Sequence, residues 1–186
     1  MTLLAISLTV VAATYLFGSL WVLAPRKVGY RHLQHTISEI GEVGSPHQRF
    51  VAFGLFLPIG LLLVAVGILV HAASPPTAAL AFCIAIGYII AAAFPCDPGS
   101  PFSGSTRQAI HNLGGAVEYI GGAFALMTLA ESHDQPFRAA GFVVLGAAIL
   151  LSVLPANSVR GTVQRVAEVC LFGALALALW RSGGVA

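Results

Sequence analysis

The amino-acid sequence predicts an all-α fold, an integral membrane bundle of six transmembrane helices. Of its 186 residues, 58% are hydrophobic and only 9% are charged, whereas soluble domains carry about 25% charged residues. Six segments are mostly apolar over about 20 residues, the length that an α-helix needs to cross a bilayer. A surface of this composition is solvated by lipid, so we expect a single six-span membrane domain over residues 1–186.

The six predicted spans are joined by short connections. The first apolar run continues to Ala24 without a positively charged start and is long for a signal peptide, so we expect it to be retained. The sixth span is the least apolar, because Gln164, Arg165 and Glu168 fall in its first turns. In chain order, the predicted spans cover residues 3–24, 50–72, 77–95, 108–130, 138–154 and 162–180.

The connection after the first span is predicted to form a short amphipathic helix over Tyr30–Glu42, lying at the membrane interface. At about 100° per residue, His35 and Glu39 fall on one face, and Ile37 and Ile40 fall on the opposite face. Polar side chains one turn apart are typical of helical metal sites and also of stabilising pairs on a solvated face. Both interpretations stay open at this point.

The connection after the third span carries Phe94-Pro95-Cys96-Asp97-Pro98-Gly99. Proline disfavours helix in the residue before it, so the third span should end at this motif. Asp97 is either a turn former in strong turn chemistry or a functional carboxylate. Cys96, or Ser38 in the first connection, is a candidate nucleophile if a histidine lies beside it.

The fourth span holds the deepest polar group. Glu118 lies ten residues beyond Gln108, which is about 15 Å along a helix and near the middle of a hydrocarbon layer of about 30 Å. A carboxyl group there has to be protonated, paired or in contact with water. His111 shares its helix face, nearer the connection. The alternative is a structural acid bonded to a neighbouring helix, through Tyr119, Gln164 or Arg165.

Four glycines of the fourth span remove side-chain bulk around these groups. Small residues allow close approach between membrane helices, and they would equally leave room for a ligand. Both interpretations apply to Gly114, Gly115, Gly121 and Gly122.

Three functions agree with these residues. The first is binding of a small molecule or a lipid head group in a polar, cytoplasm-facing pocket, with Arg165 or Arg107 on an anionic group. The second is a metal-dependent intramembrane hydrolase acting on a lipid, with possible ligands His35, Asp97 and His111. The third is an accessory or structural membrane protein. The candidates for a polar site are His35, Ser38, Glu39, Cys96, Asp97, His111, Glu118, Arg165 and Glu168.

The expected partners are membrane lipids and a small-molecule or lipid ligand. The sequence has no basic tract of the kind that binds nucleic acid, so no nucleic-acid partner is expected. A divalent metal is the cofactor that the hydrolase hypothesis requires. Haem is not expected, because only His111 lies at a suitable depth for an axial ligand.

The positive residues predict the orientation. Positive residues are enriched in the cytoplasmic connections of membrane proteins. The other face of the bundle holds only Arg138 and Arg181. We therefore expect both termini outside the cell membrane. The remaining seven lie in or beside the connections after spans one, three and five, and are Arg26, Lys27, Arg31, Arg49, Arg107, Arg160 and Arg165.

Two motifs in order carry a resemblance to a known family. Ile37-Ser38-Glu39-Ile40-Gly41, then the motif at residues 94–99, then His111 and Gly115 together resemble the multi-span bacterial and archaeal family catalogued as domain of unknown function 998. Ile40 stands where leucine is expected. The resemblance covers nearly the whole chain. It implies a six-span fold in a prokaryotic (inner) membrane, and it supplies no catalytic residues.

Overall fold

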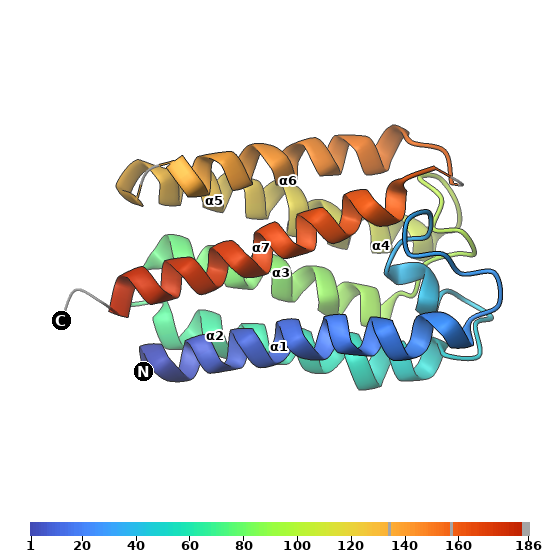
Figure 1. Ribbon diagram of the computed structural model, residues 1–186, viewed down its shortest axis with the longest axis horizontal. Helices are drawn as coiled ribbons and strands as arrows, with labels where there is room; N and C mark the ends of the chain where they lie inside the picture. Colours follow the sequence, from blue (N-terminus) through green and yellow to red (C-terminus); the bar gives the residue numbers. More distant parts are fainter. Residues whose placement is uncertain (134, 157, 184–186) are drawn as a thin grey trace.

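Six long helical stretches alternate in direction in the computed structural model, which describes residues 1–133, 135–156 and 158–183 (Figure 1). Each stretch has 19–27 residues and is apolar enough to cross a membrane, and no strand occurs among the described residues. These findings confirm the predicted all-α, six-span membrane fold. The main helices are α1 (Thr2–Leu23), η3 (Phe50–Phe56) continued by α2 (Leu57–Val70), α3 (Pro75–Ala93), α4 (Thr106–Ala116) continued by η4 (Val117–Gly121) and α5 (Gly122–His133), α6 (Gln135–Val153), and α7 (Arg160–Gly183).

The spans begin and end within about three residues of the predicted ones, for local reasons. Pro75 occupies the first position of α3, where its missing N–H costs nothing. The same helix ends before Phe94-Pro95, as the proline requires. Ser105 caps α4, because its Oγ accepts a hydrogen bond from the backbone N–H of Gln108 at 3.2 Å.

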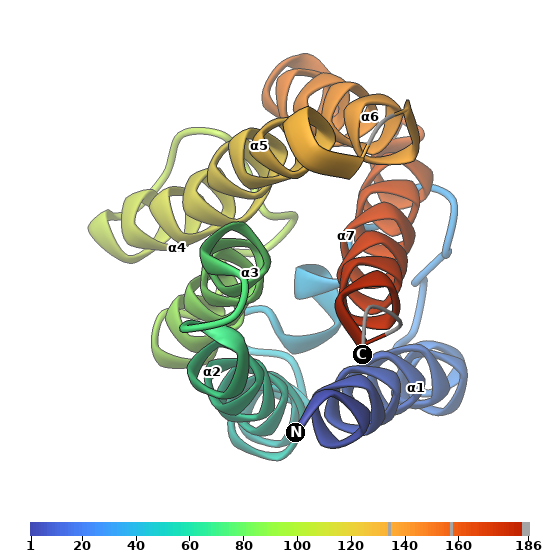
Figure 2. The ribbon, with the colours of Figure 1, turned by 90° about the vertical axis from the view of Figure 1, so that its left-hand side faces the viewer.

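The helices form a ring in chain order when viewed along their length (Figure 2). Each span packs against the next, and α7 closes the ring by packing against α1 and α3. The fourth span does not follow its neighbour throughout. Its second half, α5, packs along α6, whereas its first half, α4, leans away from α6 (Figure 2).

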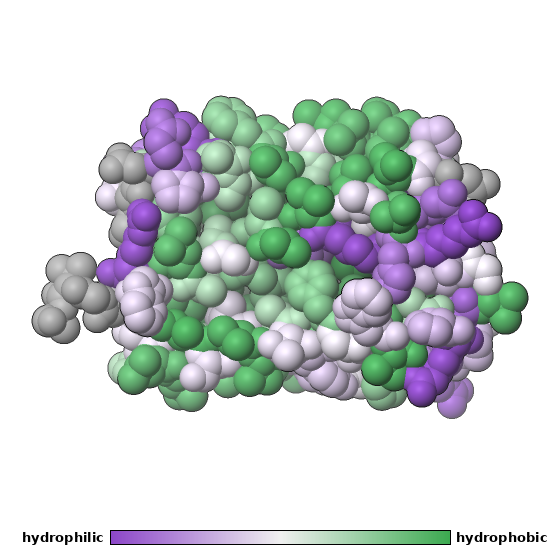
Figure 3. Space-filling view, viewed as in Figure 1, coloured by the Kyte–Doolittle hydropathy of each residue, from purple (hydrophilic) through white to green (hydrophobic). Residues whose placement is uncertain are grey.

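The exterior of the ring is apolar along its middle. Figure 3 shows hydrophobic residues over the central part of one face, with hydrophilic residues gathered toward the two ends and a hydrophilic band reaching inward from the end with the long connections. Large side chains such as Trp21, Ile68, Phe124 and Phe142 are more than half exposed. In a membrane these side chains contact lipid, whereas in a soluble bundle they would be exposed to water.

The first connection folds into the ring instead of lying on the membrane surface (Figure 2). The predicted amphipathic helix over Tyr30–Glu42 is wrong in its length and in its faces. Only Ser38–Gly41 forms a short helical turn, η2. Glu39 is 3% exposed and Ile40 is 1% exposed, so polar and apolar residues are buried alike. We call residues 36–41 the plug.

The plug is held by α7, a helix that follows it by more than 100 residues. The backbone N–H groups of Gly161 and Thr162 donate to the carbonyls of Gln34 and Leu33 at 3.2 and 3.0 Å. The N–H of Ile37 donates to Gln164 Oε1 at 2.7 Å. Backbone polar groups inside a membrane protein need such partners, because lipid offers none. The plug and the residues just before it therefore obtain hydrogen bonds from distant residues, which helical periodicity does not reveal.

Candidate functional site

An inner cavity of about 410 Å³ lies between α3, α4–η4, α6 and α7, under the plug and the second long connection. A volume of this size is within the range of ligand sites, about 300–1,000 Å³. Apart from Ser152, its α6 wall is apolar, with Leu145, Ala148 and Ile149. The polar residues that line it are Thr36, Ser38, Ser100, His111, Asn112, Glu118, Tyr119, Ser152, Arg160 and Gln164.

A second hollow, of about 690 Å³, follows the outer face of α1 beside Phe50. Its walls are mostly apolar, and Arg26 is the one charged residue among its described lining residues. Although it is larger, it has none of the buried polar groups that would orient a ligand. The inner cavity is therefore the candidate site.

Two carboxyl groups meet at the deep end of the inner cavity. Glu118 and Glu168 are 6% and 1% exposed, and their side chains lie close enough to interact electrostatically. Glu168 accepts hydrogen bonds from the hydroxyls of Tyr88 and Tyr119 at 2.9 and 2.7 Å. The two acids therefore form one buried pair.

Glu118 keeps one oxygen free beside the cavity. Its Oε1 is buried and has no hydrogen-bond partner within the described part of the chain. Its other oxygen lies against Gly87 of α3, where any side chain would occupy the same space. A buried oxygen without a hydrogen bond is costly, which distinguishes this atom from the paired oxygens of Glu168.

A π-helical turn presents these residues. Glu118 and Tyr119 both lie in η4, between the α-helical halves of the fourth span. Such turns are rare and are frequent at functional sites. The turn brings consecutive side chains to the same neighbour, because Glu118 contacts Glu168 while Tyr119 bonds to it.

His111 lines the cavity between the carboxyl pair and the connection. Its Nδ1 lies 2.9 Å from the carbonyl oxygen of Phe94. A carbonyl only accepts, so Nδ1 carries the hydrogen, and Nε2 of the neutral ring is an acceptor. The first residue of the Phe-Pro-Cys-Asp-Pro-Gly motif thus fixes the orientation of this imidazole.

Arg160, at the start of α7, lines the cavity near the connections. Its Nη1 and Nη2 donate to the carbonyls of Gly99 and Ser100 at 3.2 and 2.7 Å. The residue is only 6% exposed, its Nε has no partner among the described residues, and no described carboxylate forms an ion pair with it. The cavity wall therefore carries a buried positive charge that no described anion balances.

Asp97 fastens the second long connection to α4. Its carboxylate accepts from the N–H and Oγ of Ser105, both at 2.8 Å, and from Arg107 Nη2 at 2.7 Å. The N–H of Ser105 contributes most, with Arg107 next, to holding the pKa of Asp97 below its usual value. The turn-former interpretation agrees with these contacts, and Arg107 pairs with Asp97 (Asp97 Oδ1–Nη2, 2.7 Å).

Cys96 is buried under the same connection at 1% exposure. Burial, with the nearby charge of Glu42 as a second cause, raises the pKa of its thiol to about 12. The thiolate is the nucleophilic form of cysteine, so Cys96 stays protonated and unreactive at neutral pH. Its carbonyl accepts from the N–H of Val43 at 2.9 Å, which joins the two connections.

Arg165 supports the first connection from α7. Its Nη1 donates to the carbonyls of His32 and His35 at 2.6 and 3.1 Å, and its Nη2 donates to the hydroxyl of Tyr30 at 2.6 Å. Burial raises the pKa of Tyr30, so the phenol stays protonated beside this cation. Burial, followed by the charge of Arg165, lowers the pKa of His32. Arg165 forms no salt bridge with Glu168, which lies three residues farther along the same helix.

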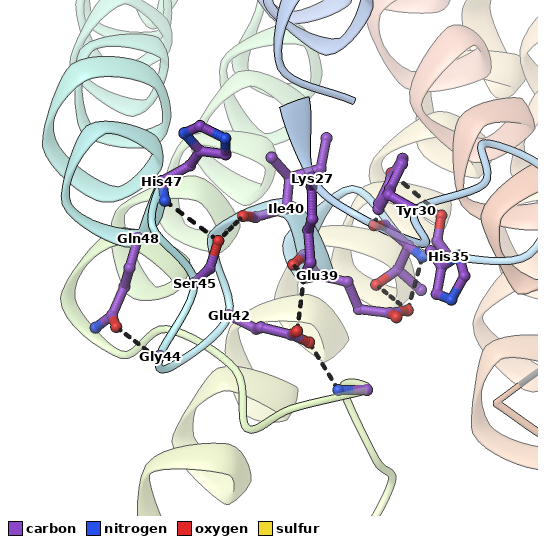
Figure 4. Close-up of polar contacts among 12 residues, drawn as sticks. Lys27, Tyr30, His35, Glu39, Ile40, Glu42, Gly44, Ser45, His47 and Gln48 are labelled. Carbon is purple, nitrogen blue, oxygen red and sulfur yellow. Dashed lines mark hydrogen bonds and ion pairs between the residues drawn. The ribbon is translucent and has the colours of Figure 1, made fainter. Parts of the chain in front are cut away.

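Glu39 and Glu42 are also bound within the connections (Figure 4). Glu39 Oε1 accepts from the N–H of Thr36 at 2.8 Å, and the Glu39 carbonyl accepts from Lys27. Lys27 Nζ also lies 2.6 Å from Glu42 Oε1. The other Glu42 oxygen accepts from the N–H of Gly99 at 2.8 Å. Glu42 thus joins Lys27, shortly after α1, to Gly99 of the second connection.

The structure brings together only part of the predicted site. Ser38, His111 and Glu118 line the inner cavity, and Glu168 lies behind Glu118. His35, Glu39, Cys96, Asp97 and Arg165 do not line it, because they hold the two connections in place.

The possible metal ligands lie apart. His35 Nδ1 accepts from the N–H of Arg31 at 2.9 Å, while Asp97 and His111 bind the groups given above. Among the residues that the structure describes, no three His, Cys, Asp or Glu side chains are placed to hold a metal ion. The predicted set of His35, Asp97 and His111 is therefore not a metal site in this structure.

Arg160 and Asn112 are among the lining residues that sequence reasoning does not identify as site residues. The sequence indicates Arg160 only as a topology marker, and nothing in its surroundings signals burial. Asn112 follows His111 directly, and its Nδ2 donates to the carbonyl of Phe102 at 2.7 Å. Its position next to His111 is the signal that the sequence offers for Asn112.

The two motifs that carried the family resemblance form most of the plug and hold two of the residues that line the cavity. The Ile-Ser-Glu-Ile-Gly motif forms most of the plug, and the Phe-Pro-Cys-Asp-Pro-Gly motif orients His111 and provides a carbonyl to Arg160. No curated protein and no solved structure gives a significant match to the chain. The sequence profile of the family described as "Protein of unknown function (DUF998)" matches residues 10–181, and the chain belongs to this family of membrane proteins.

Proposed function

We propose that the inner cavity binds the polar head group of an amphipathic molecule that reaches it from the bilayer. The observation that carries this proposal is the free oxygen of Glu118, buried in the wall of a cavity of ligand size. A hydroxyl or amine of the ligand would donate to this oxygen. His111 Nε2 and Tyr119 offer further polar contacts near it.

The walls support entry from the side. Ile120 and Ile149 line the cavity and are 41% and 59% exposed on the outside of the bundle. They belong to η4 and α6, at the place where α4 leans away from α6 (Figure 2). A head group in the cavity would thus leave its apolar chain between these helices, in contact with lipid.

We propose further that the connections carrying the plug face the cytoplasm of a prokaryotic cell membrane, with both termini outside. The excess of positive residues at this end supports the orientation. Figure 1 shows the start of α1 and the end of α7 on the side opposite the plug.

Native mass spectrometry of the purified protein tests head-group binding. The wild type should retain amphiphile from its membrane. Glu118→Met keeps the length of the side chain but has no oxygen, so it should lose about tenfold in occupancy, the effect of one hydrogen bond to a charged or strongly polar group. Glu118→Gln keeps an amide oxygen at this position and should retain most of the ligand.

Glu131→Gln is the matched control, because Glu131 lies exposed near the opposite end of α5. If Glu118→Met lowers the yield of folded protein but leaves the bound molecules unchanged, the accessory role replaces this proposal. Purified wild-type protein that retains no amphiphile would also contradict the proposed head-group binding.

A further inference from the structure

The guanidinium of Arg160 is unusual in its surroundings. Buried charges in proteins are normally paired with an opposite charge. At the same end of the bundle, Lys27 forms a salt bridge with Glu42, and Arg107 forms one with Asp97. Arg160 is more buried than either, yet its partners are the two neutral carbonyls of Gly99 and Ser100.

The free donors of Arg160 suit an oxyanion. A guanidinium has five N–H groups arranged as a fork. Two of them bond to the carbonyls, and the buried Nε–H has no partner in the described chain. The Nε–H and a remaining Nη–H form an edge that matches two oxygens of a carboxylate or phosphate.

The position of Arg160 relates this edge to the carboxyl pair. Arg160 begins α7, and Glu168 lies eight residues deeper, about 12 Å along the helix. The same cavity touches Arg160 and Glu118. One head group would thus meet a positive charge near the membrane surface and an acceptor oxygen farther in.

We propose that Arg160 binds an oxyanion carried by the ligand, so that the amphiphile is anionic and also bears a hydrogen-bond donor for Glu118. This inference rests on the proposed head-group binding. It reassigns the anion contact expected for Arg165 or Arg107, since those side chains hold the connections. A phospholipid phosphate, a fatty-acid carboxylate and free phosphate share the required chemistry.

A comparison of candidate ligands on the wild-type protein tests the oxyanion contact without any variant. Purified protein in neutral detergent is given an anionic phosphatidylglycerol, a diacylglycerol with the same chains, a fatty acid, or inorganic phosphate, and the bound species are weighed by native mass spectrometry. The phospholipid should bind about tenfold more tightly than the diacylglycerol, as one charge-assisted contact predicts. Binding of the fatty acid or of inorganic phosphate in its place would support the oxyanion site and identify the source.

Variants then assign the preference to one residue. Arg160→Gln should bind phospholipid and diacylglycerol equally, because its amide can still donate to a carbonyl but carries no charge. Arg160→Lys keeps the charge without the fork and should retain part of the preference, which covers the case in which the glutamine variant fails to fold. Arg138→Gln is the matched control, since Arg138 is exposed near the other end of the bundle.

Two results would separate failure of this inference from failure of the proposed function. If the wild type binds diacylglycerol and phosphatidylglycerol equally, head-group binding stands and the oxyanion contact is overturned. If neither lipid nor any other amphiphile is retained, the proposed function itself fails. A preference that survives Arg160→Gln unchanged also overturns the role of Arg160.

Discussion

Glu168 and Glu118 form one buried unit with unequal environments. Glu168 accepts from two tyrosine hydroxyls, whereas Glu118 Oε1 has no partner in the described chain. Glu168, whose two oxygens are both hydrogen-bonded, contributes to the packing of α3, η4 and α7. Glu118, which has a free oxygen, lines the cavity. Mutations that lower stability should therefore be distinguishable from mutations that weaken ligand binding.

The two tyrosines allow that separation to be measured. Tyr88→Phe and Tyr119→Phe each remove one hydrogen bond to Glu168, and each should lower the free energy of unfolding by about 1–3 kcal/mol. Only Tyr119 lines the cavity, so only Tyr119→Phe should also reduce retained amphiphile. Denaturant unfolding in detergent and native mass spectrometry give the two values, and equal effects on ligand from both variants would contradict the separation.

The contacts of Asp97 predict a pH dependence. Since its pKa is lowered in the folded protein, its contribution to stability is present above the unfolded value, near 3.9, and is lost as the pH falls through the folded value. Wild type and Asp97→Asn should differ in melting temperature at pH 6 to 7, about two to three units above that value, and the difference should shrink below it. A difference that grows with acidification would be inconsistent with this assignment.

Gly161 lies where α7 meets the first connection. A Cβ at this position would overlap the carbonyls of His32 and His35. Gly161→Ala should therefore cost about 1–3 kcal/mol, as for other overpacked sites. Gly173→Ala in the same helix meets open space and should be neutral or stabilising by about 0.4–1 kcal/mol. Thermal unfolding of both variants measures the contrast, and equal melting temperatures would argue against a close contact at 161.

At the scale of elements, the four glycines of the fourth span divide by role. Gly114, Gly121 and Gly122 lie against Ile90, Cys83 and Leu171, so they permit close helix packing. A Cβ added at Gly115 would have no other atom within 4 Å, and Gly115 lines the cavity. Both interpretations of the sequence therefore apply, each to different positions.

Filling the space beside Gly115 tests the cavity directly. Gly115→Leu should keep the fold and remove most retained amphiphile, because its side chain would occupy the ligand volume. Gly146→Leu is the matched control, since Gly146 also faces open space but is not a lining residue. Native mass spectrometry of both variants compares them, and undiminished occupancy in Gly115→Leu would place the ligand elsewhere.

The spans were predictable and the plug was not. A stretch such as residues 57–70 is apolar at every position, so length and composition suffice to place it. The plug contains the same alternation as an amphipathic helix, but Gln164 and the start of α7 supply its hydrogen bonds. Partners more than 100 residues away leave no local pattern.

The site was predictable in its residue types more than in its contacts. The depth of Glu118 in an apolar span was a sufficient signal, because carboxyl groups are rare there. Arg165 and Arg160 are both arginines near the start of α7, yet one holds the first connection and the other lines the cavity. Which of the two side chains faces the cavity depends on helix packing, which the sequence does not specify.

Across the whole molecule, the positive charges serve two purposes. Lys27, Arg107, Arg160 and Arg165 bond to carbonyls or to a carboxylate within the connections. Without them, Arg26, Arg31 and Arg49 still outnumber Arg138 and Arg181 at the other end. The expected orientation therefore does not depend on the structural cations.

A reporter fused to the C-terminus measures the orientation. Alkaline phosphatase at this position should be active, because it folds only outside the cytoplasm, and green fluorescent protein should be dark. A fusion in the connection between α3 and α4 should give the reverse pair. Fluorescence from the C-terminal fusion would invert the arrangement proposed for the plug.

The plug covers the end of the ring while the wall between η4 and α6 reaches the lipid-facing surface. A site filled in this way draws on the two-dimensional solution of the bilayer, where the relevant quantity is the mole fraction of the amphiphile among other lipids. Diluting the surrounding water would leave its occupancy unchanged, whereas altering lipid synthesis would shift it. Occupancy of the cavity would then follow the composition of the membrane.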